Sequence, residues 1–282
     1  MHEWSLVFFT TISQIAAGIM IAILPFVFAK TQKAYPKLIQ TAFYSAAGLM
    51  FIALILSFLH LNNPLHSVYA LSNLGTSWLS REILFVSLFL FCLVFISLIP
   101  FVKKPKTGYY KTFILITTLV GIVLIYSMAM LYIIPTVPAW NSPSTMIAFY
   151  STVLLLGSAF VLALAFHFEI NTEKQQRPLI PLRIITFHMQ LAVAAIVINS
   201  LFPGPATPEG NIGFEPEAQG AMVNLARWAT MLIAAGIWVY VRYKKDSLKQ
   251  SRFFYYLPFI FFLISELIAR SAFYASFYNI GL

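Results

Sequence analysis

Ionisable side chains are scarce in this chain, and several of them lie within or at the ends of long apolar segments. His60 ends one apolar segment and Glu82 opens the next, while Glu266 and Arg270 lie four residues apart near the end of the chain. An ionisable group at membrane depth is costly and usually has a function. A histidine or a carboxylate there can accept a proton from a substrate that loses protons together with electrons, as a quinol does on oxidation.

Each of these residues also has a structural interpretation. Ser80 could cap a helix that begins near Glu82, because an acidic residue in the first turn suits the helix dipole. His60 could bind the free carbonyls at the end of its helix. Glu266 and Arg270 would share one helix face and could form a buried ion pair that fixes the last helix. The residues alone leave these alternatives open.

The histidines are not arranged as haem ligands. A haem b needs axial ligands at matching depth on facing helices, whereas His60, His167 and His188 are expected at three different depths and His66 falls in a loop. The sequence also lacks clustered ligands with the spacing of a metal site. We therefore predict neither haem nor metal in this chain.

The composition predicts which elements must position these groups. The chain has 282 residues, of which 60% are hydrophobic and only 10% are charged, whereas a soluble domain has about 25% charged residues. Segments long enough to cross a bilayer, roughly 20 residues each, lie at 5–29, 38–59, 82–101, 112–134, 146–168, 180–201, 222–241 and 253–275. We predict an all-α polytopic membrane protein, a bundle of eight transmembrane helices forming one domain over residues 1–282.

The basic residues predict the orientation of the bundle. Of the 18 lysines and arginines, 15 fall after the first, third, fifth or seventh predicted helix; the exceptions are Arg81, Arg227 and Arg270. The positive-inside rule places that basic side in the cytoplasm, so both termini face the periplasm. The net charge of +9 is thus explained by topology and does not indicate nucleic-acid binding. The periplasmic connections are longer and rich in Pro, Gly and Asn, which favours a functional face there. Trp4, Trp78, Trp140 and Trp228 fall near this face, as in an aromatic interface belt.

Four sequence blocks resemble a known family over essentially the whole chain. They are "HEWSLVFFTTISQIAAG" near the start, "SFLHLNNPLHSVYALSNLGTSWLSREI" in the middle, "TVPAW" at 136–140 and "SELIARSAFY" near the end. In these blocks the chain resembles the DmsC-like membrane anchor subunits of bacterial dimethyl sulfoxide reductase-type molybdoenzymes. It departs modestly from the family pattern at Asn62–Asn63 and at Arg81.

The resemblance implies a haem-free, eight-helix subunit of the bacterial inner membrane that serves anaerobic respiration. Such an anchor binds menaquinol near the periplasmic face and oxidises it to menaquinone. The electrons pass to an iron–sulfur subunit and then to a molybdopterin catalytic subunit, both on the periplasmic side, so the anchor is not a complete enzyme alone. The family's quinol-oxidising histidine and acid fall on His60 and Glu82, and Ser80, Arg81, Glu266 and Arg270 are weaker candidates for quinol binding.

Two other functions remain as alternatives. A secondary transporter usually has broken helices in two repeated halves, and Pro25 and Pro258 do not form such a pair. A purely structural anchor without quinol chemistry would have the same helices. The terminal electron acceptor depends on the catalytic subunit and is left open.

Overall fold

The computed structural model describes residues 4–29, 35–60, 67–102, 107–169, 179–180, 217–243 and 252–276, and within these ranges every regular element is a helix. Seven are long, and three short elements connect them. The elements are α1 (Trp4–Phe28), α2 (Pro36–His60), α3 (Ser67–Ala70), η3 (Leu71–Asn73), α4 (Trp78–Val102), α5 (Thr107–Tyr132), α6 (Pro143–His167), α9 (Glu217–Tyr243), η4 (Arg252–Tyr255) and α10 (Leu257–Ala275).

The chain is a multi-pass membrane protein. In the described residues, six helices are long and apolar enough to cross a membrane, namely α1, α2, α4, α5, α6 and α10, and α9 contains a shorter apolar part at Leu225–Val241. These helices confirm the corresponding predicted segments to within a few residues. The predicted helix at 180–201 lies outside the described residues apart from Ile180, so the predicted total of eight helices stays a prediction.

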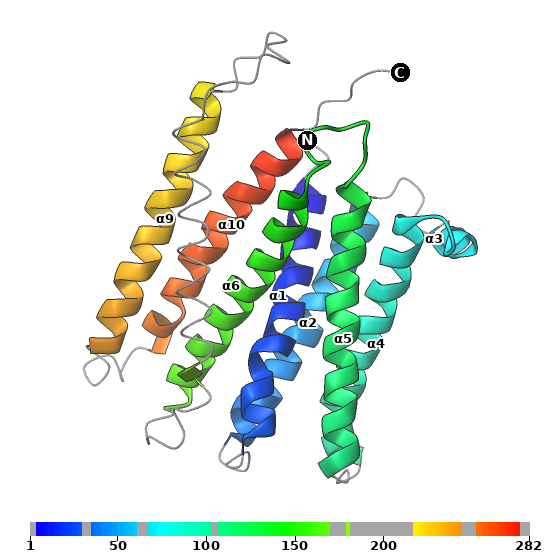
Figure 1. Ribbon diagram of the computed structural model, residues 1–282. Coiled ribbons are helices and arrows are strands. Elements are labelled where there is room, and N and C mark those ends of the chain that lie inside the picture. Colours follow the sequence, from blue (N-terminus) through cyan, green and yellow to red (C-terminus); the bar gives the residue numbers. More distant parts are fainter. Residues whose placement is uncertain are drawn as a thin grey trace.

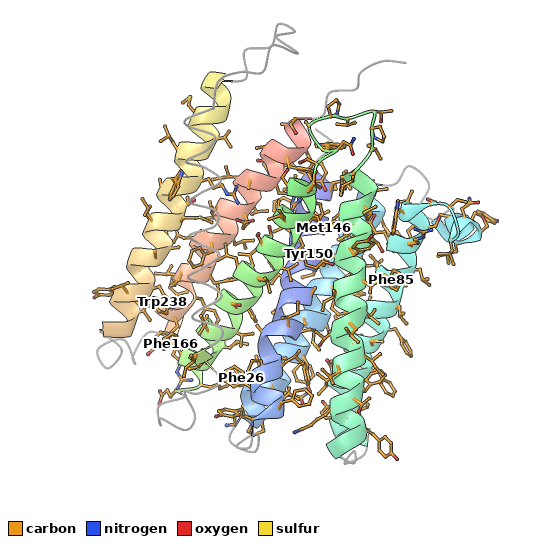
Figure 2. The ribbon with its side chains drawn as sticks, viewed as in Figure 1. Phe26, Phe85, Met146, Tyr150, Phe166 and Trp238 are labelled. Carbon is orange, nitrogen blue, oxygen red and sulfur yellow. The ribbon has the colours of Figure 1, made fainter. Side chains whose placement is uncertain are left out.

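Helix α1 is the centre of the bundle. It packs against α2, α5, α6 and α10, while α4 packs against α5 and α2, and α9 lies on the outer side of α10 (Figure 1). Figure 2 shows Tyr150 of α6 directed toward α5, where its hydroxyl donates to the Ile122 carbonyl at 2.9 Å. The buried Phe26 of α1 belongs to the same hydrophobic core. The apolar span of α1 is 78% buried by protein, whereas those of α2 and α4 are only 28% and 39% buried.

Two glycines allow α1 and α6 to cross in backbone contact. A Cβ atom built on Gly18 would lie 2.9 Å from the Gly157 Cα atom and closer still to the Val153 carbonyl oxygen. A Cβ built on Gly157 would overlap the backbone of Gly18. Small residues permit this close approach, which is a common way for membrane helices to associate.

One end of the bundle gathers the segments that carry the predicted site. The beginnings of α1, α4 and α6 and the ends of α2, α5 and α10 all lie at the upper end of the view in Figure 1. Lys37, Lys111 and Arg252 lie near the beginnings of α2, α5 and α10, and so at the opposite end. The alternation of the helices therefore brings His60, Glu82 and Arg270 to the half of the bundle that carries few basic residues.

Candidate functional site

Helix α4 begins earlier than predicted, which places Glu82 in its second turn. The helix begins at Trp78, and the Ser77 hydroxyl accepts a hydrogen bond from the Ser80 amide at 3.3 Å. Ser77 is therefore the capping residue. Ser80 lies inside the first turn with its side chain buried, and Glu82 lies in the second turn, past the unpaired amides of the helix start. The predicted capping interpretation of Ser80 and Glu82 is wrong, because the helix begins four residues before the apolar segment.

The Glu82 carboxylate faces the interior of the bundle. Its residue is only 4% exposed, and among the described residues no group forms a hydrogen bond or an ion pair with it. A buried carboxylate without a partner is costly, which makes Glu82 a candidate functional residue.

Arg81 does not compensate the charge of Glu82. Its guanidinium donates to the Leu74 carbonyl at 2.9 Å and to the Gly75 carbonyl at 2.7 Å, and it stacks over the Trp78 ring at 4.1 Å. Neighbouring residues on a helix point in different directions. Arg81 thus ties the connection before α4 to the helix, while Glu82 points inward.

A pair of tyrosines links Glu82 to α10. The Tyr274 hydroxyl donates to the Tyr132 hydroxyl at 2.8 Å and lies 3.4 Å from the Thr10 hydroxyl. Both tyrosine hydroxyls interact electrostatically with Glu82 and with Arg270. The bond between Tyr132 of α5 and Tyr274 of α10 therefore joins the helix that packs against α4 to the helix that carries Glu266 and Arg270, a link that the sequence could not predict.

Trp140 closes this cluster from the connection between α5 and α6. Its indole stacks on Phe273 with ring centroids 5.2 Å apart and meets Tyr132 edge-on at 5.3 Å. The indole N–H donates to the Phe273 carbonyl at 2.8 Å. Trp140 is buried, so the prediction that it belongs to a lipid-interface belt is wrong. Trp4, by contrast, is exposed, as a belt residue would be.

Arg270 is buried against α1 and α6. It donates to the Gln14 side-chain oxygen at 3.0 Å, and its guanidinium lies 3.9 Å from the centre of the Phe149 ring. A cation over an aromatic face gains a favourable interaction that grows when water is excluded. The Gln14 side-chain nitrogen has no hydrogen-bond partner among the described residues.

Glu266 pairs with a different arginine from the one predicted. Its carboxylate forms an ion pair with Arg227 of α9 at 2.9 Å and accepts a hydrogen bond from Thr152 of α6 at 2.6 Å. The predicted direct pair of Glu266 with Arg270 is therefore wrong. Glu266, Arg270 and Tyr274 follow one another at intervals of four residues, so they form a stripe along α10 of roughly 12 Å. Each member of this stripe has its own partner on another helix.

The remaining predicted residues are only partly described. His60 is the last residue of α2, and its side chain lies outside the described part of the structure, as do His66 and His188. His167 ends α6 at the opposite end of the bundle from Glu82. Within the described residues, no group of three or more His, Cys, Asp or Glu side chains could hold a metal ion.

The sequence reasoning missed Thr10, Gln14, Tyr132, Tyr274 and Arg227. Three signals could have found four of them. Thr10 and Gln14 are polar residues four apart in an apolar helix, and Tyr274 continues the four-residue spacing of Glu266 and Arg270. Arg227 could be identified as one of three basic residues outside the loops that are predicted to be cytoplasmic. Tyr132 carries no such signal, because one tyrosine among 14 is unremarkable at a helix end.

Comparison with known proteins finds a family that matches nearly the whole chain. The family model described as DMSO reductase anchor subunit (DmsC) matches residues 1–276. The YnfH chain of an anaerobic dimethyl sulfoxide reductase from Escherichia coli (strain K12) is 27% identical over 289 residues, covering 100% of this sequence and 97% of the relative. The C subunit of anaerobic dimethyl sulfoxide reductase from the same organism is 24% identical over 291 residues, again with 100% and 97% coverage.

A third relative matches over a shorter region. The C subunit of anaerobic dimethyl sulfoxide reductase from Haemophilus influenzae is 32% identical over 167 residues, which are 58% of this sequence and 59% of the relative. No solved structure matches the protein.

Proposed function

The chain belongs to the DmsC family of dimethyl sulfoxide reductase anchor subunits, and from this premise we propose that it binds menaquinol at the Glu82 end of the bundle and oxidises it. Membership in the family supports the role of membrane anchor in a molybdoenzyme complex of anaerobic respiration. Quinol oxidation and the face at which it occurs are the finer parts of the proposal.

The single observation that carries the proposal is the buried Glu82 carboxylate. It is 4% exposed, and no described residue bonds to it. Glu82 lies near the end of the membrane span, where a quinol head group can enter from the lipid and where a proton has a short path to water. Once its capping role is removed, Glu82 has no structural duty in the described part of the chain.

The chemistry requires two proton acceptors. Oxidation of a quinol breaks two O–H bonds and yields a quinone, two protons and two electrons. We assign one proton to the Glu82 carboxylate and the other to the His60 imidazole, which can act as a base near neutral pH. His60 ends α2, and α2 packs against α4. The electrons leave for the iron–sulfur subunit, which passes them to the molybdopterin catalytic subunit.

The other predicted residues receive supporting roles in this proposal. Ser80 lines the buried face of α4 one turn from the cap, and Arg81 ties the connection before α4 to the helix. Arg270 and Glu266 belong to the polar stripe of α10, where Arg270 reaches the site through its electrostatic effect on the tyrosine pair. Their hydrogen bonds to other helices favour a positioning role over direct contact with the quinol.

The proposed location is the bacterial inner membrane, with the Glu82 end toward the periplasm. The distribution of basic residues supports this orientation. The iron–sulfur and catalytic subunits would then dock on the periplasmic end, close to the quinol from which the electrons come.

A quinol analogue tests the proposal directly. Fluorescence titration of the assembled complex with such an analogue is compared for the wild type, His60→Ala and Glu82→Gln, with Glu169→Gln as a control. Glu169 is an exposed carboxylate that pairs with Arg252 at 3.8 Å at the opposite end of the bundle. We expect weaker binding in the His60 and Glu82 variants and wild-type binding in the control. Equal binding by all four proteins, or binding by none, would overturn the proposal and leave a purely structural anchor.

A further inference from the structure

The Tyr132 ring is fixed by its neighbours, so its hydroxyl has a defined position. Edge-on contacts join it to Trp140, Phe273 and Tyr274 with ring centroids 5.3–5.5 Å apart, and Phe149 lies tilted at 5.7 Å. Contacts with four aromatic neighbours prevent the ring from changing its side-chain rotamer. The remaining freedom of this side chain is the rotation of its O–H bond.

Three hydroxyl groups, those of Thr10, Tyr132 and Tyr274, each have one proton to donate in this cluster. Thr10 donates its proton to the Leu6 carbonyl at 2.8 Å, a bond common for threonine in helices, so Thr10 acts only as an acceptor toward Tyr274. Tyr274 lies nearer to Tyr132, at 2.8 Å, than to Thr10, at 3.4 Å. When Tyr274 donates its single proton across the shorter distance, the proton of Tyr132 is left for another acceptor. Among the described residues, no hydrogen bond uses it.

Tyr132 is the member of the tyrosine pair whose helix packs against the helix of Glu82. Both tyrosines are buried, Tyr132 at 7% exposed and Tyr274 at 2%, so the Tyr132 hydroxyl is open only to a ligand that enters the bundle. Tyr132 ends α5, and α5 packs against α4, which carries Glu82. Glu82 also acts electrostatically on the Tyr132 hydroxyl. An acceptor oxygen placed beside Glu82 would therefore meet an oriented O–H donor.

We propose that Tyr132 is a further quinol-binding residue, whose hydroxyl donates a hydrogen bond to a ring oxygen of the quinol bound beside Glu82. Tyr274 is the positioning residue that holds this hydroxyl in its donating orientation. The inference rests on the proposed function and extends it to α5 and α10. A donor of this kind serves both redox states, because a quinol oxygen and a quinone oxygen each accept a hydrogen bond.

Removal of single hydroxyl groups tests the inference without disturbing the aromatic packing. The variants are Tyr132→Phe, Tyr274→Phe, the double variant and Tyr110→Phe. Tyr110 is the matched control, because it lies on the same helix at the opposite end and its hydroxyl also donates, to the Ile96 carbonyl at 3.0 Å. The Kd of a quinol analogue and the KM for quinol are measured on the assembled complex, together with its apparent Tm.

We expect Tyr132→Phe to raise Kd and KM about 3- to 10-fold, the worth of one hydrogen bond, while Tyr110→Phe leaves both unchanged. Tyr274→Phe should have a smaller effect, and the double variant should match Tyr132→Phe alone, because Tyr274 acts through Tyr132. Simple addition of the two effects would refute the positioning role of Tyr274.

The outcome for Glu82→Gln separates this inference from the proposed function. If that variant binds the analogue weakly but Tyr132→Phe binds it normally, Tyr132 is not a quinol ligand and the proposed function stands. If both variants bind the analogue as the wild type does, the proposed function itself fails. A fall in apparent Tm for Tyr132→Phe with unchanged Kd would make the hydroxyl purely structural and overturn the inference.

Discussion

Substitution of Gly18 by alanine should force α1 and α6 apart. A relaxed carbon–carbon contact is about 3.5–4.0 Å long, whereas the new Cβ would lie 2.9 Å from the Gly157 Cα atom. The two helices must therefore separate by roughly 0.6 Å or more at the crossing. Backbone atoms cannot rotate aside, as the end of a flexible side chain could, so the whole crossing has to yield. Overpacking of this kind costs about 1–3 kcal/mol.

Two other glycines provide matched controls. Gly48 in α2 and Gly236 in α9 have nothing within 4 Å of a built Cβ atom, so alanine there meets no clash. Alanine in a helix gains about 0.5–1 kcal/mol over glycine at every one of these positions. The difference between Gly18→Ala and Gly48→Ala is therefore the overpacking cost alone, about 1–3 kcal/mol.

The assay is the apparent Tm of the purified subunit or complex in detergent, followed at one scan rate for all variants. Gly18→Ala and Gly157→Ala should unfold several degrees below Gly48→Ala and Gly236→Ala. The two crossing variants should also lose part of their quinol affinity, because α1 carries Thr10 and Gln14, the partners of Tyr274 and Arg270. If Gly18→Ala is as stable as Gly48→Ala, the backbone contact between α1 and α6 is refuted.

Two further predictions concern polar contacts. Glu266→Gln should lower the apparent Tm by an amount equivalent to about 1–3 kcal/mol, because the partly buried Arg227 loses its ion-pair partner; a Tm equal to that of Glu169→Gln would contradict the pairing. Arg81→Ala should speed proteolysis between residues 67 and 77, because the bonds to Leu74 and Gly75 are lost. Arg81→Lys should behave in the same way, since lysine lacks the guanidinium fork, and wild-type resistance in both variants would exclude this role.

The sequence predicted the helices well because each apolar segment must span a similar thickness of membrane. Six of the predicted segments correspond to helices of suitable length and polarity. The predicted beginning of α4, at residue 82, was the error with the largest consequence for the site. Hydropathy marks where lipid begins, whereas the helix begins at its cap, and Ser77 lies ahead of the apolar segment. That shift moves Glu82 from the first turn to a buried position in the second.

Partners across helices could not be predicted from spacing along one helix. The interval of four residues placed Glu266 and Arg270 on one face of α10, which the structure confirms, yet their partners come from α9, α6 and α1. Tyr132 illustrates the same limit. Its importance comes from Tyr274, which is 142 residues away in the sequence, and no local pattern reports a contact between helices so distant along the chain.

The rate of quinol oxidation in the Glu82→Gln complex tests the central claim most directly. The whole complex is assayed with a menaquinol analogue, and a soluble one-electron dye that reduces the partner subunits provides an independent measure of their activity. Loss of a positioned proton acceptor typically slows a reaction about 10²- to 10⁴-fold. We predict a fall of this order with quinol, an unchanged rate with the dye, and wild-type rates for Glu169→Gln with both donors. A Glu82→Gln complex that oxidises quinol at the wild-type rate would contradict the account.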